Sequence, residues 1–418
     1  MALVTSENLF LNRAKFVMKH LGVWMPPKKE SVLSKLFRLL VISPQYLFLI
    51  FQIIYIVQTW GDFVAVSQAF FLMFTQACLC FKVTVFHVNV ENLRDLLAQM
   101  NGPVFQPQSF IQEQILRRQA TRIKRLLMAF MLSSQVTCGL WCLKPLFDEA
   151  GSRNFPFKMW MPVSNKYTPQ YELGFAFQLL TISMSAFMYF GVDSVALSMM
   201  IFACAQLDII KDKILNVSQS RYYVFKISLK IFTDQDFSFS IIFSDEFIKL
   251  LENTYHIYLL FQIAGSVGIF CLTALIILVV DWRSVQFFSS LFYLLVMVSQ
   301  LFVCCWCGHE LTATSEDLLT VMYKCTWYEQ DNRFRRDLRF AMMRMSHPIV
   351  FRAGHYISVS RQTFVGILRM SYSYFAPSQI INLFINRVSH MRSVHSRHFR
   401  QKCAYFMKVM KKYILYSL

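Results

Sequence analysis

Charged residues are scarce in this sequence, and acidic residues are the scarcest of them. Only 16% of its 418 residues are charged whereas 56% are hydrophobic, which is unlike an ordinary soluble domain. Lys and Arg number 42 against 24 Asp and Glu, so that the net charge is +18. Such a charge is compatible with nucleic-acid binding, but membrane proteins also gather Lys and Arg at one face. We therefore expect a membrane protein that binds no nucleic acid.

The sequence motifs of common enzymes are also missing. The chain has no glycine-rich phosphate loop, no HExxH and no GxSxG. Its eleven cysteines are scattered, most of them within apolar runs, and their spacing indicates no disulfide framework. Cys304-Cys305-Trp306-Cys307 brings three thiols together, but a second pair that would complete a zinc site is lacking. We expect no enzymatic activity, no metal site and no cofactor.

Long apolar segments are present instead, and they predict an all-α membrane protein with seven transmembrane helices in one domain, residues 1–375. The seventh segment is the least apolar, because it contains Arg352, Arg361 and Arg369. The fourth is longer than a bilayer requires, so that one end is expected to project into water. The predicted spans are 37–57, 64–88, 126–147, 173–205, 256–280, 284–307 and 347–375.

The distribution of Lys and Arg between these spans predicts a cytoplasmic N-terminus. Every second connection contains six of these residues, whereas the alternate connections contain none, three and one. The rich connections are 1–36, 89–125, 206–255 and 308–346, and the poor ones are 58–63, 148–172 and 281–283. A G-protein-coupled receptor has the opposite orientation, and its Asp-Arg-Tyr and Asn-Pro-x-x-Tyr motifs are missing. A metabotropic seven-span receptor and a transporter are the alternatives from other classes.

The C-terminal part of the sequence resembles the insect odorant receptors. The strongest stretches are "CCWCGHELTATSEDLLTVMYKCTWYE" (304–329) and "RRDLRFAMMRMSHPIVFRAGHYISVSRQTFVGILRMSYSYF" (335–375). A further match is "FPFKMWMPVSNKYTPQYELGFAFQ" (155–178), and a diffuse likeness covers most of residues 1–215 and 244–375. The gustatory receptors, which would give a similar ligand-gated channel, are the nearest rival. Here, however, Thr363-Phe364 is not followed by their Gln-Phe pair.

This resemblance implies an odorant-specific subunit of a ligand-gated cation channel. Four subunits would surround a central pore, and the partner would be the shared odorant receptor co-receptor, Orco. The resemblance also implies a multi-pass protein of the plasma membrane, expected in the dendrites of olfactory sensory neurons. Cytoplasmic extensions of helices four to seven would form an anchor that holds the subunits together.

The seventh helix of such receptors lines the pore, and the hydroxyl-rich end of the last predicted span is compatible with a water-filled path. Unsatisfied polar groups are costly in hydrocarbon, so that they face protein or an aqueous cavity. Hydrogen bonds of Ser371 and Ser373 between packed helices are the alternative. The pore-lining candidates are Thr363, Ile367, Ser371, Tyr374 and Phe375.

Odorants are small and apolar, and a site for them requires an apolar cavity with a few polar groups that orient the ligand. Aromatic and Met side chains in the outer halves of the second to fourth spans can provide it, because Met repacks around varied ligands. For any single residue, ordinary helix packing is the alternative. The odorant-binding candidates are Phe70, Phe71, Phe74, Trp141, Met184, Phe187, Met188 and Tyr189.

Two other polar positions have structural interpretations. Asp193 lies deep in the fourth predicted span, where a lone carboxylate is costly, and we expect it to pair with a neighbouring helix. Contact with water at an inner vestibule is the alternative. Ser315 is followed by Glu316 and Asp317, and it is expected to cap a helix over 315–328.

Two segments depart from the family pattern. Residues 219–243 are an atypical insertion, which lacks the paired histidines that usually mark the end of a cytoplasmic helix there. Residues 376–418 form a basic C-terminal extension that does not resemble the family, and Pro377 would break the last turn of the seventh helix. We hypothesise that both segments are translated intron or an altered transcript end.

Overall fold

Helices make up most of the chain that the structure describes. The computed structural model describes residues 5–25, 31–60, 63–147, 155–163, 167–219, 234–280, 283–329 and 332–373. The helices are α1 (Ser6–His20), α2 (Val32–Gln58), α3 (Phe63–Val88), α4 (Val90–Met100), α5 (Phe110–Phe147), α6 (Gln170–Gln219), α8 (Asp234–Val279), α9 (Val285–Lys324) and α10 (Asn332–Met345), with 3₁₀ turns η1 (Pro103–Phe105) and η2 (Trp327–Glu329). Residues 361–373 form a further helix. The prediction of an all-α membrane protein is confirmed.

Five of the described helices are long and apolar enough to cross a membrane. Their apolar parts lie in Val32–Gln58, Ala69–Val88, Gln170–Leu215, Ser244–Leu278 and Val285–Lys324. These five correspond to the first, second, fourth, fifth and sixth predicted spans. The third predicted span, 126–147, lies in the C-terminal half of α5.

The last predicted span, 347–375, differs from the structure, because its helix begins only at residue 361. Before it, strand β1 (Arg352–Ala353) pairs antiparallel with β2 (Ile357–Ser358). The central turn residues Gly354 and His355 have φ values of 60° and 65°, and two positive φ angles are what a type I′ turn requires. Pro348 also disfavours helical geometry at the residue before it. The apolar character of this segment therefore misled the helix prediction.

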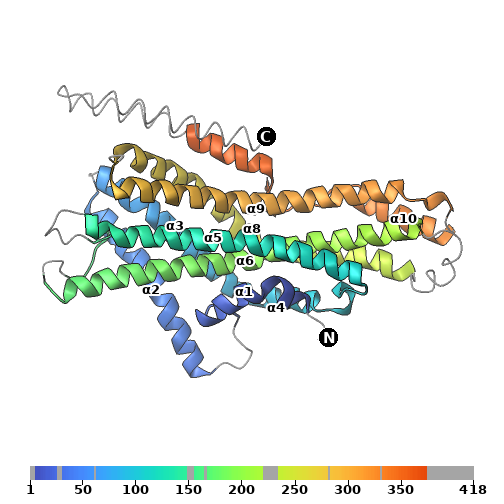
Figure 1. Ribbon diagram of the computed structural model, residues 1–418, viewed down its shortest axis with the longest axis horizontal. Helices are drawn as coiled ribbons and strands as arrows, with labels where there is room; N and C mark the ends of the chain where they lie inside the picture. Colours follow the sequence, from blue (N-terminus) through green and yellow to red (C-terminus); the bar gives the residue numbers. More distant parts are fainter. Residues whose placement is uncertain are drawn as a thin grey trace.

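Helix α6 is the central helix of the bundle, and α1, α5, α8 and α9 pack against it (Figure 1). Of its most apolar stretch, 94% is buried within the chain, against 28% for the apolar stretch of α2. The outward side chains of α2 include Val32, Leu33 and Leu36, and this peripheral helix therefore offers its apolar surface to lipid. In Figure 1, α2 diverges from the long axis that α5, α6 and α9 follow.

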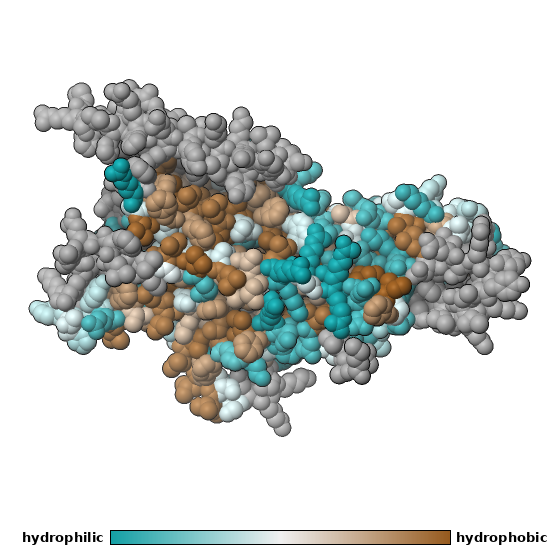
Figure 2. All heavy atoms as spheres, in the orientation of Figure 1, coloured by the Kyte–Doolittle hydropathy of each residue, from teal (hydrophilic) through white to brown (hydrophobic). Residues whose placement is uncertain are grey.

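The molecule has an apolar half and a polar half along its long axis. Helix α6 has 50 residues and is therefore about 75 Å long at a rise of about 1.5 Å per residue. The hydrocarbon core of a bilayer is only about 30 Å thick. Figure 2 shows hydrophobic surface over the end where α5 finishes and α6 begins, and hydrophilic surface towards the end that carries α10. The predicted projection of the fourth span into water agrees with this length.

Helix α9 runs without interruption through the position where a second helix was expected to begin. The predicted cap at Ser315 is wrong, because this residue lies inside α9. Its Oγ donates to the carbonyl oxygen of Thr312 at 2.7 Å and accepts a hydrogen bond from the backbone nitrogen of Ile349 at 3.0 Å. A serine that returns its hydroxyl to the preceding turn fits within a helix. Ser315 thus attaches the segment before the hairpin to α9.

A glycine allows the hairpin to approach α9 closely. A Cβ at Gly308 would lie 2.4 Å from the carbonyl oxygen of Val359, a distance at which the backbone would have to move. A residue without a side chain is therefore required where the two backbones meet.

The two atypical segments fall largely outside the described residues. Gln219 is the last residue of α6, and residues 234–243 are helical as the start of α8. The rest of the proposed insertion, 220–233, and the whole extension 376–418 lie outside the residues that the structure describes. The hypothesis of translated intron stays a prediction.

Candidate functional site

A cavity lies within the apolar half of the bundle, between helices α3, α5, α6 and α9. The empty space between its lining side chains, which includes space open to solvent, is about 590 Å³. The apolar lining residues are Leu72, Leu79, Phe130, Cys138, Trp141, Ile182, Ala186, Val296 and Met297. The polar lining residues are Thr75, Gln76, Ser134, Thr137, Ser185, Tyr189, Tyr293 and Gln300.

A cluster of hydrogen-bonded side chains at the cavity wall joins three helices. Gln76 of α3 donates a hydrogen bond through Nε2 to Oε1 of Gln45 in α2, over 2.8 Å. Ser185 of α6 donates to the same oxygen over 2.5 Å. All three residues are buried, and because water is absent from hydrocarbon, their polar atoms have to satisfy one another. This contact fixes the relative positions of two cavity-lining helices.

A buried ion pair lies next to the cavity. Nζ of Lys82 in α3 lies 2.7 Å from Oδ1 of Asp193 in α6, and their side chains are only 1% and 6% exposed. The carboxylate also accepts hydrogen bonds from the hydroxyl of Tyr258 and the amide nitrogen of Gln300. The ammonium group lies 3.9 Å from the ring centre of Tyr189, a cavity-lining residue. Asp193 therefore has partners on α3, α8 and α9, and its expected pairing is confirmed.

Two of the eight odorant-binding candidates line this cavity. Trp141 is 8% exposed, and its ring centre lies 5.6 Å from that of Tyr293 across the wall. Tyr189 is also buried, and its hydroxyl donates to Oε1 of Gln262 over 3.2 Å. Phe71 lies one layer behind the wall, because its ring packs edge-on against Tyr293 with centres 5.5 Å apart.

The other candidates are not in the wall. Phe70 and Phe74 pack against each other with ring centres 5.9 Å apart, and Phe74 lies beside Gly268 of α8. Met188 is fully buried in the helical core, whereas Met184 and Phe187 are half-buried. The candidates therefore lie on three helices that line the cavity, but most of them do not face it, and all eight assignments to odorant binding stay predictions.

The sequence reasoning missed the contribution of α9. Its wall residues are Tyr293, Val296, Met297 and Gln300, whose spacing places them on one helix face. A signal was present, because Tyr293 and Gln300 are polar residues two turns apart within an apolar span. Lys82 was also missed, although the sequence carried a signal for it: it is the only Lys or Arg in the predicted span 64–88. An ionisable residue at such depth requires a partner.

The pore-lining candidates of the last helix turn mostly inward in the single chain. Ile367 is 5% exposed and Ser371 is 3% exposed, and the hydroxyl of Ser371 donates to the carbonyl oxygen of Ile367 over 2.9 Å. The Sγ of Cys271 in α8 approaches the carbonyl oxygen of Ser371 to 3.4 Å. Thr363 is half-buried and donates to the carbonyl oxygen of Ser358 over 2.5 Å. Tyr374 and Phe375 lie outside the described residues.

The opposite face of this helix is open. Gln362, Arg369 and Ser373 are exposed, and a Cβ added at Gly366 would meet nothing within 4 Å. The spacing of these four positions, three to four residues, places them on one helix face.

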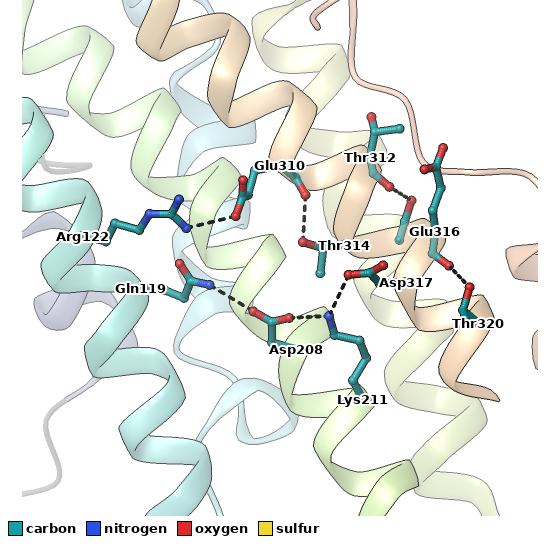
Figure 3. A network of polar contacts seen from close by, with 11 residues as sticks. Gln119, Arg122, Asp208, Lys211, Glu310, Thr312, Thr314, Glu316, Asp317 and Thr320 are labelled. Atoms are coloured by element: carbon teal, nitrogen blue, oxygen red, sulfur yellow. Dashed lines mark hydrogen bonds and ion pairs between the residues drawn. The ribbon is translucent and has the colours of Figure 1, made fainter. Parts of the chain in front are cut away.

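The polar half carries a second set of charged contacts, which joins α5, α6 and α9 (Figure 3). Nη1 of Arg122 lies 3.0 Å from Oε1 of Glu310, and its guanidinium lies 4.4 Å from the ring centre of Trp306. Lys211 pairs with Asp208 at 2.9 Å. Figure 3 shows contacts between helices at Arg122 with Glu310, at Gln119 with Asp208 and at Lys211 with Asp317. They therefore contribute to helix packing outside the apolar half.

Within the part of the chain that the structure describes, no group of three or more His, Cys, Asp or Glu residues is arranged to hold a metal ion. Cys304, Cys305 and Cys307 are buried thiols of α9.

A bundle of long apolar helices around a largely apolar cavity defines a helical membrane protein with a candidate small-molecule site. The 7tm Odorant receptor family model matches residues 62–372, and the chain belongs to this family. It is 22% identical to odorant receptor Or1 of Anopheles gambiae over 390 residues, which cover 87% of this chain and 93% of that protein. It is 26% identical to odorant receptor 46a, isoform A, of Drosophila melanogaster over 322 residues, 76% of this chain and 83% of that one.

The fold is shared with a solved olfactory receptor. The structure of the insect olfactory receptor OR5 from Machilis hrabei in complex with eugenol matches with a TM-score of 0.77, at 15% sequence identity. The match covers 90% of this chain and 98% of the other. The chain is therefore a membrane receptor of the odorant receptor family with the fold of insect olfactory receptors.

Proposed function

We propose that this protein binds small volatile odorants in the cavity between α3, α5, α6 and α9, and that binding opens a cation pathway formed together with the odorant receptor co-receptor. The cavity carries the proposal, because its wall is mainly apolar and aromatic and contains a few polar groups, as a site for small apolar ligands requires. A ligand that binds the open state more tightly than the closed state shifts the population towards opening. The site of action would be the plasma membrane of olfactory sensory neuron dendrites.

Expression with and without the co-receptor tests the assembly. Currents recorded against an odorant panel should appear only when both chains are present. A chain that responds equally well alone contradicts the need for the partner. Responses that are abolished by blocking G proteins and are independent of the co-receptor would favour a metabotropic receptor.

A cavity-filling substitution tests the position of the site. Ala186 lines the cavity from α6, so that Ala186→Leu would occupy space that a ligand needs. Ala176, on the same helix, is exposed, and Ala176→Leu is the matched control. We expect the first variant to raise the half-maximal odorant concentration by about tenfold or more, since a loss of about 1.4 kcal/mol corresponds to that factor. The control should respond like the parent chain. Equal responses of both variants would locate binding elsewhere.

The ion pathway is proposed to run along the open face of residues 361–373. Ser373 lies on that face whereas Ile367 is buried, so that Ser373→Cys should react with a charged thiol reagent and change the current, and Ile367→Cys should not. Arg369 shares the open face, and a positive charge there opposes cations. Arg369→Gln is therefore expected to raise cation conductance. Protection of both engineered thiols would argue that this helix is surrounded by protein or lipid.

The N-terminus is proposed to be cytoplasmic, because every second connection between the predicted spans is rich in Lys and Arg. An epitope tag at the N-terminus should be stained only after the cells are permeabilised. Staining of intact cells would reverse the orientation.

A further inference from the structure

One outward face of α5 changes from cationic to apolar along the helix. The exposed residues Arg118, Arg125, Ala129, Leu132 and Val136 follow one another at spacings of three, four or seven, which places them on one side of α5. Leu132 and Val136 are 56% and 52% exposed. Figure 2 shows hydrophilic side chains beside hydrophobic surface where α5 passes from one half of the molecule to the other. Arg125 therefore lies at the boundary of the two halves, next to an aliphatic stripe that faces lipid.

Two contacts between α5 and α6 give the depth of this boundary. Gln119 donates a hydrogen bond to Oδ2 of Asp208 over 3.0 Å, and Ser183 donates to Oε1 of Gln135 over 3.3 Å. Arg125 lies between these contacts along α5. It is therefore level with the part of α6 between residues 183 and 208.

Helix α1 brings a further cation to the same depth. The ring centre of Phe10 lies 5.4 Å from that of Phe202 in α6, and a Cβ at Gly191 would lie 2.5 Å from Cγ of Met18. Arg13 lies between Phe10 and Met18 in α1, and it is exposed. Its charge is therefore level with the same part of α6.

Arg13 approaches a second cation of α5, Lys124. Burial and, to a smaller extent, the charge of Arg13 lower the pKa of Lys124. Among the described residues, Arg13, Lys124 and Arg125 have no hydrogen-bond or ion-pair partner. Arg122, by contrast, is paired with Glu310. We call Arg13, Lys124 and Arg125 the cationic cluster, and its uncompensated charges favour an anion beside them.

We propose that the cationic cluster binds an anionic phospholipid of the leaflet next to the polar half, with the phosphate at the cluster and an acyl chain along Leu132 and Val136. Arginine binds phosphate oxygens through two parallel hydrogen bonds. Basic residues beside a membrane span also attract anionic lipid headgroups. A soluble anion would use only the charges, whereas a lipid also covers the aliphatic stripe that continues from Arg125. This inference is independent of the proposed odorant cavity.

The test measures the unfolding temperature of the purified full-length chain in nanodiscs. The discs contain phosphatidylcholine alone or phosphatidylcholine mixed with increasing amounts of phosphatidylserine. The anionic lipid should raise the unfolding temperature, because a molecule that binds only the folded chain stabilises it. Soluble glycerophosphoserine should not produce this shift. An equal unfolding temperature in both lipids would overturn the proposal, and an equal shift with the soluble headgroup would overturn the lipid as the occupant.

Arg118 provides a matched control for Arg125. Both are exposed and lack a described partner on the same face of α5, but Arg118 lies two turns further into the polar half. Arg125→Gln and Arg13→Gln should each raise the amount of phosphatidylserine needed for half the shift by about fivefold. Arg118→Gln should leave it unchanged, and Arg125→Lys should retain most of it. Equal losses in Arg125→Gln and Arg118→Gln would indicate diffuse attraction and contradict the site.

Two further measurements apply whether or not a variant folds well. The unfolding temperature of each variant in phosphatidylcholine alone reports its stability without the anionic lipid, and these exposed substitutions should leave it at the parent value. In the parent chain, the shift caused by phosphatidylserine should shrink in about 1 M salt, where the screening length is about 3 Å. A shift that is unchanged by salt would contradict the role of the cationic cluster.

Discussion

The apolar and polar halves of this molecule both contain ion pairs that join helices, but the surroundings of these pairs differ. In the apolar half, Lys82 and Asp193 are almost fully buried. In the polar half, the side chains of Arg122 and Glu310 are 48% and 24% exposed. Water can solvate the second pair when it separates, whereas the first has only protein around it. Breaking the ion pair is therefore expected to destabilise the apolar half strongly and the polar half only slightly.

The largest expected effect comes from breaking the buried pair on one side. Lys82→Met leaves the carboxylate of Asp193 buried without its cation, and loss of one partner of a buried pair costs about 3–5 kcal/mol. Asp193→Asn leaves the ammonium group of Lys82 buried without its anion. We expect both single variants to lose surface expression and to unfold at a much lower temperature than the parent chain in detergent.

The double variant Lys82→Met, Asp193→Asn is the control for this comparison. It removes both charges and retains an amide oxygen for the hydroxyl of Tyr258, so that it should recover most of the unfolding temperature. Additive losses in the double variant would show that the charges themselves are not coupled.

A smaller effect is expected in the polar half. Arg122→Gln removes the ion pair with Glu310 and the contact of the guanidinium with the ring of Trp306, which together contribute about 1–2 kcal/mol. Glu310→Gln removes only the ion pair, so that it should lower the unfolding temperature less. Both effects of charge should shrink in high salt, where the screening length falls to about 3 Å at about 1 M. A larger loss in Glu310→Gln than in Arg122→Gln would refute the contribution of the ring.

The smallest effect is expected at Asp317. Its side chain is 73% exposed and its carboxylate lies 3.7 Å from Nζ of Lys211, which has Asp208 as a closer partner at 2.9 Å. Asp317→Asn should therefore leave the unfolding temperature within experimental error of the parent value. A measurable destabilisation would mean that Asp317 has a partner in the assembled receptor.

Much of the fold followed from the sequence, because a bilayer makes apolar length a direct requirement. The predicted spans for α2, α3, α6, α8 and α9 all fall on helices that can cross a membrane. The prediction failed around residues 347–360, where the chain is apolar enough for a helix but Gly354 and His355 form a turn. It also failed at Ser315, since the same hydroxyl can cap a helix or bond back within one.

The candidate site was less predictable than the helices. Trp141 and Tyr189 were proposed because aromatic residues suit an odorant cavity, and both line the cavity. Phe70 and Phe74 are also aromatic, but they lie outside its wall. Which face of a helix turns inward depends on its rotation against its neighbours. That rotation is set by contacts between distant residues, such as Gln45 with Gln76 and Ser185.

The sequence by itself determined the membrane class, the all-helical architecture and the family resemblance, because apolar run length and local motifs are properties of contiguous residues. Only the tertiary structure decided that Lys82 meets Asp193 and that Gln300 donates a hydrogen bond to the same carboxylate. These contacts join residues more than a hundred positions apart, and their energies depend on burial, which exists only once the helices have packed.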